Sequence, residues 1–224
     1  MDIQDRVYHL TDATNWPSIQ RHGLLSAQAL LDLAHIDQEE QLRINQHQRQ
    51  TQLVLPNGTF LNDQKPMPPT ALERCLHGMT PAQWYTLLNS KVFFWFDIER
   101  LNRLRKVLAS IPQIVLVIDT QRLLARYDDS ISLSPINTGN ARRQPALRGS
   151  STFVPYTTWL QTGWASEAEA LGTRPRPKSH HPVELTVTGS VPDITSFVIN
   201  ICRLEPMELL TSSEKNDHQA LGTL

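Results

Sequence analysis

The stretch "VYHLTDATNWPSIQRHGLLS", residues 7–26, predicts a short strand followed by a helix that ends at a glycine. Side chains alternate between the two faces of a strand, so Val7, His9 and Thr11 share one face. His9 and Thr11 therefore look out together from a strand that is otherwise apolar. A rigid element aims such a pair well for binding, although a lone histidine in a strand is more often structural.

The residues around this strand predict helices with defined ends. Pro17 lies in the first turn of the first helix, and Gly23 is expected to end that helix in a left-handed conformation. Ser26 is expected to cap a second helix that runs through Leu33. Residues 38–52 have a helix-forming composition with weak apolar periodicity, which predicts a solvated helix that serves as scaffolding.

The composition indicates a protein with a sizeable core and little overall charge. The 224 residues are 40% apolar, which favours one domain, expected over residues 1–210. A formal net charge of −1 excludes a globally basic protein, so any nucleic-acid partner has to be bound by a local patch. Cys75 and Cys202 lie far apart and form no metal-binding pattern, which is typical of a reduced, cytoplasmic protein. No apolar run reaches the roughly 20 residues that a membrane span needs.

The middle of the chain predicts the densest part of the core. An Asn-Gly pair and the prolines from Pro66 onward predict a hairpin followed by a structured loop. A helix is expected to start at Thr80, before the aromatic strand "VFFWF" at residues 92–96. "IERLNRLRKVLAS" predicts an amphipathic helix, and "QIVLVID" a strand buried on both faces. Asp119 or Thr120 is expected to cap the helix that follows.

The last third of the chain predicts a loop and two strands. Residues 134–159 are rich in turn-forming residues and predict a long functional loop with one short strand at "STFVPY". In the strand at 183–188, Glu184 is expected on the polar, exposed face. The turn "GSVPDI" predicts a hairpin with a return strand in which Phe197, Ile199 and Ile201 are in register for burial. The tail after Leu210 lacks core residues and is expected to be disordered.

The order of these strands resembles the ADP-ribosyltransferases, which cleave the nicotinamide–ribose bond of NAD. The closer resemblance is to the DarT-type group, which modifies DNA. The blocks similar to that group are "YHLTDATNWPSIQRHGLLS", "VFFWFDIERLNRL", "NTGNA" before "STF", and "VELTVTGSVPDI". An uncharacterised bacterial domain family with "YHLT", "DQKPM", "VFFW", "SPIN" and "VELTV" blocks is similar as well. The blocks span most of residues 7–201, and their order carries the resemblance.

This resemblance implies a single α+β domain in which two packed, mostly antiparallel sheets surround an NAD cleft with flanking helices. It implies mono-ADP-ribosyl transfer from NAD to a base of DNA or RNA, with NAD as a substrate, nicotinamide as the leaving group and no metal. The expected acceptor is single-stranded nucleic acid. The expected setting is a cytoplasmic bacterial toxin or phage-defence effector with an antitoxin or a reversing hydrolase as partner, and no membrane. Three alternatives stay open: a transferase that modifies protein, an enzyme like the RNA 2′-phosphotransferases, and an inactive module that binds NAD or nucleic acid.

The chemistry of glycosidic cleavage explains why the reaction would need several of these residue types. Departure of nicotinamide leaves an oxocarbenium-like ribose, which the carboxylate of Glu184 can stabilise. His9 with Thr11 is expected to hold a ribose. Phe94 or Trp95 is expected to stack on the nicotinamide ring. Further residues expected to contact NAD are Gln64, Asn140, Thr152 and Phe153.

Basic residues are assigned to phosphates and to the acceptor. Arg142, Arg143 or Lys65 is expected to hold the pyrophosphate, and Lys65 is also expected to help deprotonate the accepting base. The acceptor is expected to meet the loop before the glutamate strand. Its basic residues are Arg174, Arg176 and Lys178, with Trp159 and Trp164 upstream able to stack on bases. His180 and His181 lack a third metal ligand at useful spacing.

Overall fold

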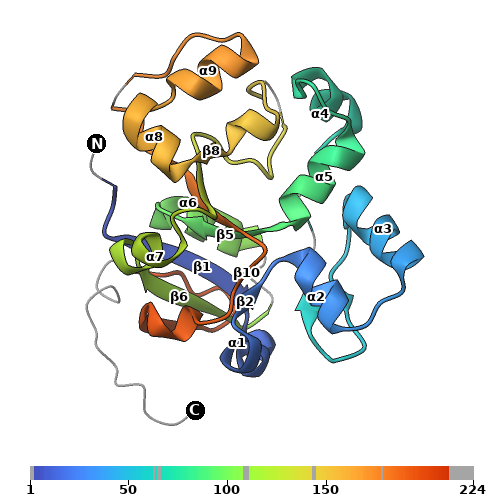
Figure 1. Cartoon of the computed structure of the whole chain (residues 1–224). Coiled ribbons are helices and arrows are strands. Elements are labelled where there is room, and N and C mark those ends of the chain that lie inside the picture. Colours follow the sequence, from blue (N-terminus) through green and yellow to red (C-terminus); the bar gives the residue numbers. More distant parts are fainter. Residues whose placement is uncertain are drawn as a thin grey trace.

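The computed structural model describes residues 3–62, 64, 67–107, 111–142, 145–177 and 179–211. Its centre is a seven-stranded sheet with the strand order β11-β6-β1-β5-β9-β7-β8, in which neighbouring strands run antiparallel (Figure 1). The strands of this sheet are β1 (Arg6–Asp12), β5 (Lys91–Trp95), β6 (Gln113–Asp119), β7 (Ile131–Ser134), β8 (Val154–Pro155), β9 (Glu184–Thr188) and β11 (Val198–Leu204). Two small ribbons pair β2 (Leu24–Leu25) with β10 (Ser190–Val191), and β3 (Leu53–Val54) with β4 (Phe60–Leu61).

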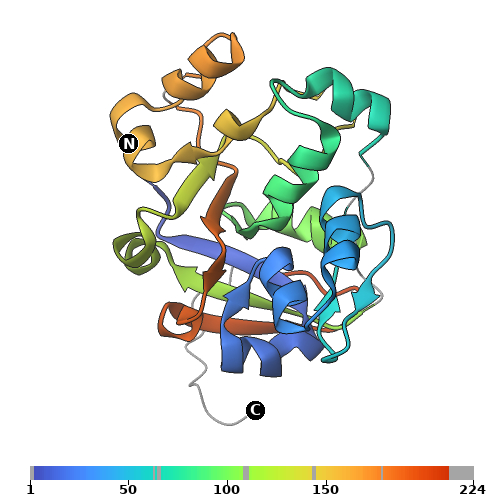
Figure 2. The same cartoon turned by 45° about the vertical axis from the view of Figure 1, so that its right-hand side comes forward.

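The large sheet is divided into two halves that meet at one place. Strands β11, β6 and β1 form one half, and β5, β9, β7 and β8 form the other. The register between the halves consists of one pair, Tyr8 opposite Trp95. Figure 2 shows the consequence, since β9 runs nearly upright where β1 and β6 lie nearly flat. The α+β class is confirmed. In place of two packed sheets there is one large sheet, whose two halves diverge on either side of the Tyr8–Trp95 pair.

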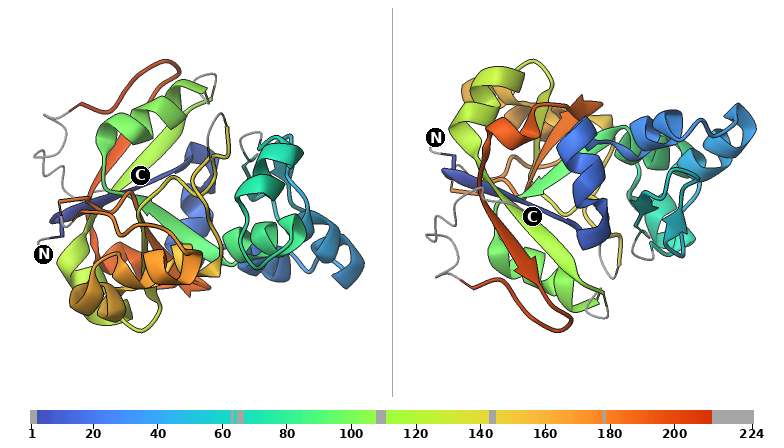
Figure 3. Two further views of the ribbon diagram at one scale, coloured as in Figure 1. Left: turned by 90° about the horizontal axis from the view of Figure 1, so that it is seen from above. Right: turned by 90° about the horizontal axis from the view of Figure 1, so that it is seen from below.

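Helices cover this sheet and build a separate lobe beside it. The helices are α1 (Trp16–His22), α2 (Ala27–Leu33), α3 (Gln38–Gln46), α4 (Pro69–Cys75), α5 (Pro81–Asn89), α6 (Ile98–Val107), α7 (Thr120–Tyr127), α8 (Tyr156–Thr162) and α9 (Ala165–Leu171), with single turns η1 (Ala13–Asn15), η2 (Ser150–Thr152) and η3 (Ile194–Ser196). Seen from above and from below, α3, α4 and α5 stand apart from the sheet as one lobe (Figure 3). Helix α6 packs on β1 and β5, at the joint between the halves.

Several local predictions are confirmed because short-range chemistry decides them. The Ser26 hydroxyl accepts from the Ala29 backbone N–H at 3.2 Å, and Thr80 forms a capping box with Gln83 at the start of α5. The Asp119 carboxylate accepts from the Arg122 backbone N–H and so begins α7. Strand β6 is buried over nearly its whole length, as its continuous apolar run predicts.

Long-range pairing explains most of the wrong predictions. The segment 183–188 forms no hairpin with 197–201, because β9 lies between β5 and β7 while β11 crosses to the far edge beside β6. A β-bulge near Asn200 shifts the alternation of β11, so Cys202 and Leu204 are buried whereas Ile199 and Ile201 are half-buried.

The predicted loop at 134–159 is also more ordered than expected. It begins at the end of β7 and contains η2, β8 and the start of α8. Neither β7 nor helices α4, α8 and α9 were predicted as such. The solvated helix at 38–52 ends at Gln46, because the chain turns extended at His47. The tail expected to be disordered lies outside the described residues from residue 212 onward.

The end of α1 shows how tightly the first stretch of sequence is constrained. Gly23 has φ +76° and ψ −168°, so the expected left-handed helical conformation is wrong, although its φ is positive. A Cβ on Gly23 would lie 2.3 Å from the backbone oxygen of Val191. Gly172 after α9 has a similar φ of +63° but nothing within 4 Å of such a Cβ. The glycine at 23 is therefore required by close packing as well as by its backbone conformation.

We expect Gly23→Ala to lower the free energy of unfolding by more than the roughly 1 kcal/mol that a left-handed alanine costs, because backbone atoms of β10 have to move. Gly172→Ala is the control for a left-handed alanine without a clash, because Gly172 has φ +63° and ψ +32°; Gly23, with ψ −168°, lies in a region that is nearly restricted to glycine, which adds to its loss. Urea unfolding of the two variants measures the difference. Equal losses would show that β10 yields easily.

Candidate functional site

A cavity of about 820 Å³ opens where the two halves of the sheet diverge. The sheet contributes His9 and Leu10 from β1, Lys91, Phe93 and Trp95 from β5, and Glu184 from β9. Helix α5 contributes Leu88 and Asn89, and α6 contributes Arg100, Arg103 and Leu104. The loop after β7 covers another side through Asn137, Thr138, Gly139, Asn140 and Arg142.

Glu184 is the carboxylate of this cavity and is buried, with 2% of its surface exposed. It begins β9 opposite Trp95 on one side and Ser134 on the other. Its carboxylate accepts from Thr138 twice, from the hydroxyl at 2.8 Å and from the backbone N–H at 3.2 Å. Burial raises the pKa of Glu184 to about 7, against the opposing effects of the Thr138 hydrogen bonds, Arg148 and Arg100. The expected exposed position is wrong, because β5 and β7 flank this strand.

Arg148 holds the loop that carries the hydrogen-bond donors of Glu184. Its guanidinium is buried and donates to the backbone oxygens of Thr138 at 3.1 Å and Asn140 at 2.9 Å. The same group lies 6.0 Å from the ring centroid of Trp84 on α5. Arg148 therefore positions Glu184 through Thr138, and it also ties this loop to the helical lobe.

His9 lies where β1 leaves β5. Its Nδ1 lies 2.8 Å from the backbone oxygen of Phe93, so Nδ1 carries the proton and donates it to that oxygen. Burial lowers the pKa of His9, which keeps the ring neutral at pH 7 and leaves Nε2 as a hydrogen-bond acceptor. The structural hydrogen bond and the binding role proposed from the sequence are compatible, since they use different nitrogens.

Cations dominate the lining of the cavity. Among the described lining residues, Glu184 is the only carboxylate. The basic side chains that line the same space are Arg49, Lys91, Arg100, Arg103 and Arg142. An excess of positive charge in a partly enclosed space favours a ligand with phosphate groups.

The structure brings together some of the residues proposed from the sequence. His9, Gln64, Trp95, Asn140 and Glu184 line the cavity. Phe94 does not: it is fully buried in the main core, because alternation along β5 sends Phe93 and Trp95 to the cavity instead. The expected stacking role of Phe94 is therefore wrong, and Phe93 is the aromatic residue that the sequence interpretation missed.

Three further proposed contacts have structural partners outside the cavity lining. Thr11 is buried and its hydroxyl accepts from Asn15 at 3.2 Å. Thr152 is buried and its hydroxyl accepts from the backbone N–H of Gly149 at 3.0 Å. Phe153 packs in the core cluster of the helical lobe. These residues support the walls of the cavity rather than its surface.

The basic residues expected to meet the acceptor are not gathered at the cavity. Arg174 is exposed, and Arg176 forms an ion pair with the buried Glu167 at 3.3 Å. Trp159 and Trp164 are both core residues whose rings pack edge-on at 5.9 Å, so the expected stacking on bases is wrong. The proposed Lys65, Arg143 and Lys178 lie outside the described residues.

Lys91 and Arg49 are site residues that the sequence interpretation missed. Alternation along the strand places Lys91 on the same face as Phe93 and Trp95. Its position in the cavity lining could therefore have been inferred from the sequence once Trp95 was assigned to the site. Arg49 follows α3 in a segment interpreted as scaffolding, and its guanidinium donates to Asn89 at 2.8 Å. No local pattern indicates that contact, because its partners come from distant parts of the chain.

Comparison with known proteins places the chain in a family. Residues 5–198 match the model of a family described as "Family of unknown function (DUF7002)", so the chain belongs to that family. No curated protein matches the chain significantly. Within the described residues, no three His, Cys, Asp or Glu side chains gather to hold a metal ion, and no helix is long and apolar enough to cross a membrane.

The buried Glu184 predicts an unusual pH dependence of stability. A carboxyl group that keeps its proton up to a pH of about 7 when folded, but only to about 4.5 when unfolded, destabilises the fold as the pH rises through this window. The loss is on the order of 3 kcal/mol by pH 8. Glu184→Gln removes it, so we expect the variant to gain stability relative to the wild type between pH 5 and pH 8. Urea unfolding at both pH values measures this gain, and parallel losses in the two proteins would contradict it.

Proposed function

We propose that this member of the DUF7002 family is a mono-ADP-ribosyltransferase that uses NAD as a substrate and a nucleic-acid base as the acceptor. The observation that carries the proposal is a single buried carboxylate, Glu184, in a cavity whose other charged groups are cations. A phosphate-bearing dinucleotide complements this charge, and the carboxylate complements the positive ribose that forms as nicotinamide leaves.

The proposed reaction breaks the bond between C1′ of the ribose and the pyridinium nitrogen. Nicotinamide leaves with the bonding electron pair and becomes neutral. The carboxylate of Glu184 stabilises the oxocarbenium-like ribose, and a nitrogen of the acceptor base donates its lone pair to C1′. The base then releases one proton to solvent or to a basic group. Because the carboxylate form is required, the free enzyme gains activity as Glu184 loses its proton.

The other groups of the cavity have roles that suit this substrate. Nε2 of His9 can accept from a ribose hydroxyl while Nδ1 stays bound to Phe93. The rings of Phe93 and Trp95 offer apolar surface to the nicotinamide.

Asn140 and Gln64 also line the cavity. The Gln64 amide is already hydrogen-bonded to Asn89 and to the Arg49 backbone N–H. The Asn140 side-chain oxygen accepts from the Arg142 backbone N–H. The NH2 group of Asn140 is therefore the proposed donor to the substrate.

Two observations support nucleic acid as the acceptor class. Arg100 and Arg103 lie three residues apart on α6 and line the cavity, and Arg100 is close enough to lower the pKa of Glu184 slightly. Arg103 is exposed and can contact phosphates outside the cavity, whereas Arg100 is partly exposed and forms an ion pair with Asp97 at 3.5 Å.

Outside the cavity lining, the exposed Arg174 is a second basic side chain that a strand could contact. Arg176, in contrast, is neutralised by its ion pair with Glu167. A protein acceptor and an inactive binding module remain as outcomes of the test.

The cluster of cations also favours a second candidate, an enzyme like the RNA 2′-phosphotransferases. Such an enzyme needs basic side chains for the 2′-phosphate, and Arg49, Arg100, Arg103 and Arg142 line one cavity here. The two candidates differ in the group that attacks C1′ of the ribose as nicotinamide leaves: a base nitrogen in the first, and an oxygen of the RNA 2′-phosphate in the second. Incubation with an RNA carrying an internal 2′-phosphate decides, because only the second candidate removes that phosphate.

The deciding experiment measures nicotinamide release and the transfer of label from NAD labelled in its adenylate half. The folded protein is offered single-stranded DNA, RNA and a protein lysate in separate reactions. We expect label on nucleic acid and a rate that rises with pH to a plateau above about 7. Glu184→Gln is expected to slow the release of nicotinamide by roughly 10²–10³-fold.

Glu169→Gln on the exposed face of α9 is the matched control and is expected to keep the wild-type rate. Near-normal release by Glu184→Gln would overturn the catalytic assignment. Label found only on protein would replace the nucleic-acid acceptor by a protein acceptor. If the wild type binds NAD but releases no nicotinamide, the protein is an inactive binding module rather than an enzyme.

His9→Ala is expected to raise KM for NAD about tenfold while changing kcat less, because His9 is proposed to hold a ribose remote from the breaking bond. His47→Ala is the matched control, since the His47 ring also contacts a backbone oxygen but lies outside the cavity lining. Steady-state kinetics and thermal midpoints of both variants are required. An unchanged KM with a lowered thermal midpoint would make His9 purely structural.

A further inference from the structure

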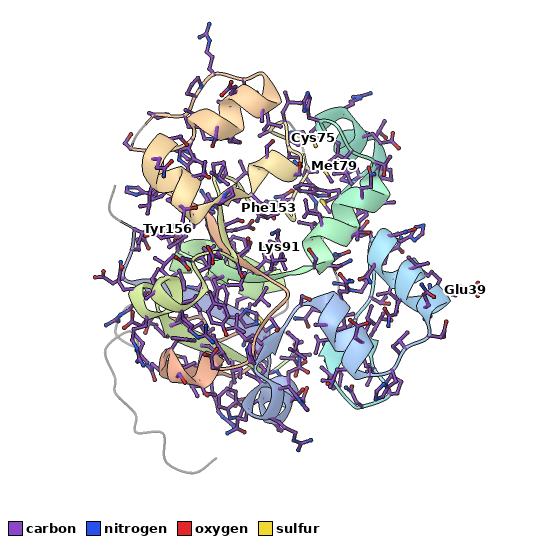
Figure 4. The ribbon with its side chains drawn as sticks, in the orientation of Figure 1. Glu39, Cys75, Met79, Lys91, Phe153 and Tyr156 are labelled. Atoms are coloured by element: carbon purple, nitrogen blue, oxygen red, sulfur yellow. The ribbon has the colours of Figure 1, made fainter. Side chains whose placement is uncertain are left out.

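Lys91 is a buried cation that faces the cavity. It begins β5, and only 8% of its surface is exposed. Its ammonium group donates to the hydroxyl of Thr188 at 3.0 Å and lies 4.9 Å from the ring centroid of Phe153. Figure 4 labels both Lys91 and Phe153 in the middle of the molecule, between the sheet and the α5 helix. Within the described part of the chain, no ion pair involves Lys91.

A buried ammonium group without a carboxylate partner is unfavourable. Burial lowers the pKa of Lys91 to about 8, and no nearby carboxylate opposes this effect. An ammonium group has three N–H donors, and the structure assigns one of them to Thr188. The side chain therefore has hydrogen-bonding capacity and charge to offer to an anion that enters the cavity.

A polar network on the lining of the same cavity contains a second cation, Arg49. The Arg49 guanidinium donates to the side-chain oxygen of Asn89, and the Gln64 amide donates to the same oxygen at 3.1 Å. Asn89 is the last residue of α5 and lies two positions before Lys91. Its own amide donates to the backbone oxygen of Asn45, so the network is anchored in the lobe.

Lys91 is well separated from Glu184 in the cavity. In the register of β5 and β9, Lys91 lies opposite Thr188 and Trp95 lies opposite Glu184. Four residues of strand separate the two pairs, about 13 Å. A dinucleotide carries its pyrophosphate at its middle, so it can place its glycosidic bond near Glu184 while its phosphates point toward Lys91.

We propose that Lys91, with Arg49, forms a subsite that binds the pyrophosphate of the dinucleotide substrate. The identity of that substrate as NAD rests on the proposed function. We assign the subsite to the dinucleotide rather than to the backbone of an acceptor strand, because Lys91 is buried whereas Arg103 is exposed on α6. A phosphodiester of a long strand reaches an exposed arginine more readily than a buried lysine.

The protonation of Lys91 can be measured only if the other titratable groups around the cavity are taken into account. Burial holds the pKa of His9 on β1 below its usual range, and Glu184 on β9 titrates near pH 7. Burial raises the pKa of Tyr85 on α5 above its usual range. An anion that binds in the cavity favours the protonated form of Lys91 and also that of Glu184, so the part of the proton uptake between pH 8 and 9 that is lost in Lys91→Arg reports Lys91.

The experiment is calorimetric titration of the folded protein with ADP-ribose at pH 8.5, in two buffers that differ in ionisation enthalpy. ADP-ribose carries the pyrophosphate but has lost the bond that reacts, so binding does not depend on turnover. We expect the wild type to take up a large fraction of a proton on binding, since a phosphate group favours the charged lysine. Adenosine, which has no phosphate, is expected to bind without proton uptake.

Two variants distinguish the contribution of the positive charge at position 91 to affinity from the uptake of a proton by Lys91. Lys91→Met is expected to weaken ADP-ribose binding by roughly ten- to a hundredfold, as for the loss of a charge-assisted hydrogen bond. Lys91→Arg is expected to keep binding but to lose the part of the proton uptake that Lys91 provides, because arginine stays charged. Lys106→Met on the exposed face of α6 is the matched control and is expected to change neither.

Unaltered affinity and proton uptake in Lys91→Met would overturn the subsite. If Lys91→Met does not fold, unaltered proton uptake in Lys91→Arg overturns it instead. If Lys91→Met weakens a short single-stranded oligonucleotide but not ADP-ribose, the assignment to the dinucleotide is wrong. Failure of the proposed function has a different signature, since Glu184→Gln would then release nicotinamide normally while the ADP-ribose result is unaffected.

Discussion

One residue pair, Tyr8 opposite Trp95, joins the two halves of the sheet, and the candidate site depends on it. Strands that diverge after a single pair leave backbone groups without a ladder partner, and buried groups of this kind have to be satisfied in another way. The side chain of His9 does this for the carbonyl oxygen of Phe93. The space opened by the divergence is then lined by the residues that point away from the core at this joint. The histidine in the middle of the first strand thus stabilises the point of divergence at which the cavity opens.

The cavity contains two ionisable groups that weaken the fold. Burial moves the pKa of Glu184 up to about 7 and that of Lys91 down to about 8, so burial favours the neutral form of each. The two groups lie at opposite ends of the β5–β9 pair and form no ion pair with each other. A fold under selection for stability alone would pair these charges or replace them by apolar side chains. Their separation is what a ligand with an anionic part and a developing positive part requires.

The sequence predicted the elements better than it predicted their neighbours. Caps such as Ser26 and alternation along β5 depend on residues close in the chain, so they can be inferred from local patterns. The placement of β11 beside β6 depends on a crossing that no local pattern indicates. The same limit applies to the site: Glu184 and His9 were inferred from the order of strands, but the contact of Arg49 with Asn89 joins residues forty positions apart. Phe94 was assigned to the wrong environment because both faces of β5 carry aromatic residues. Alternation alone does not indicate which face lines the cavity and which packs in the core.

Arg148 connects the charge of the cavity with the position of the helical lobe. Its backbone pairs with the segment after α4, through Cys75 and His77, while its guanidinium holds the carbonyl oxygens of the loop that binds Glu184. A movement of the lobe that displaces Arg148 also displaces Thr138, and Glu184 then loses the two donors that oppose the effect of burial on its pKa. The protonation of the carboxylate is thereby coupled to the seating of α4 and α5. Since α5 also carries Asn89, which binds Arg49 and the backbone of Asn45, the helical lobe contributes to the cavity at Arg49 as well as through Arg148.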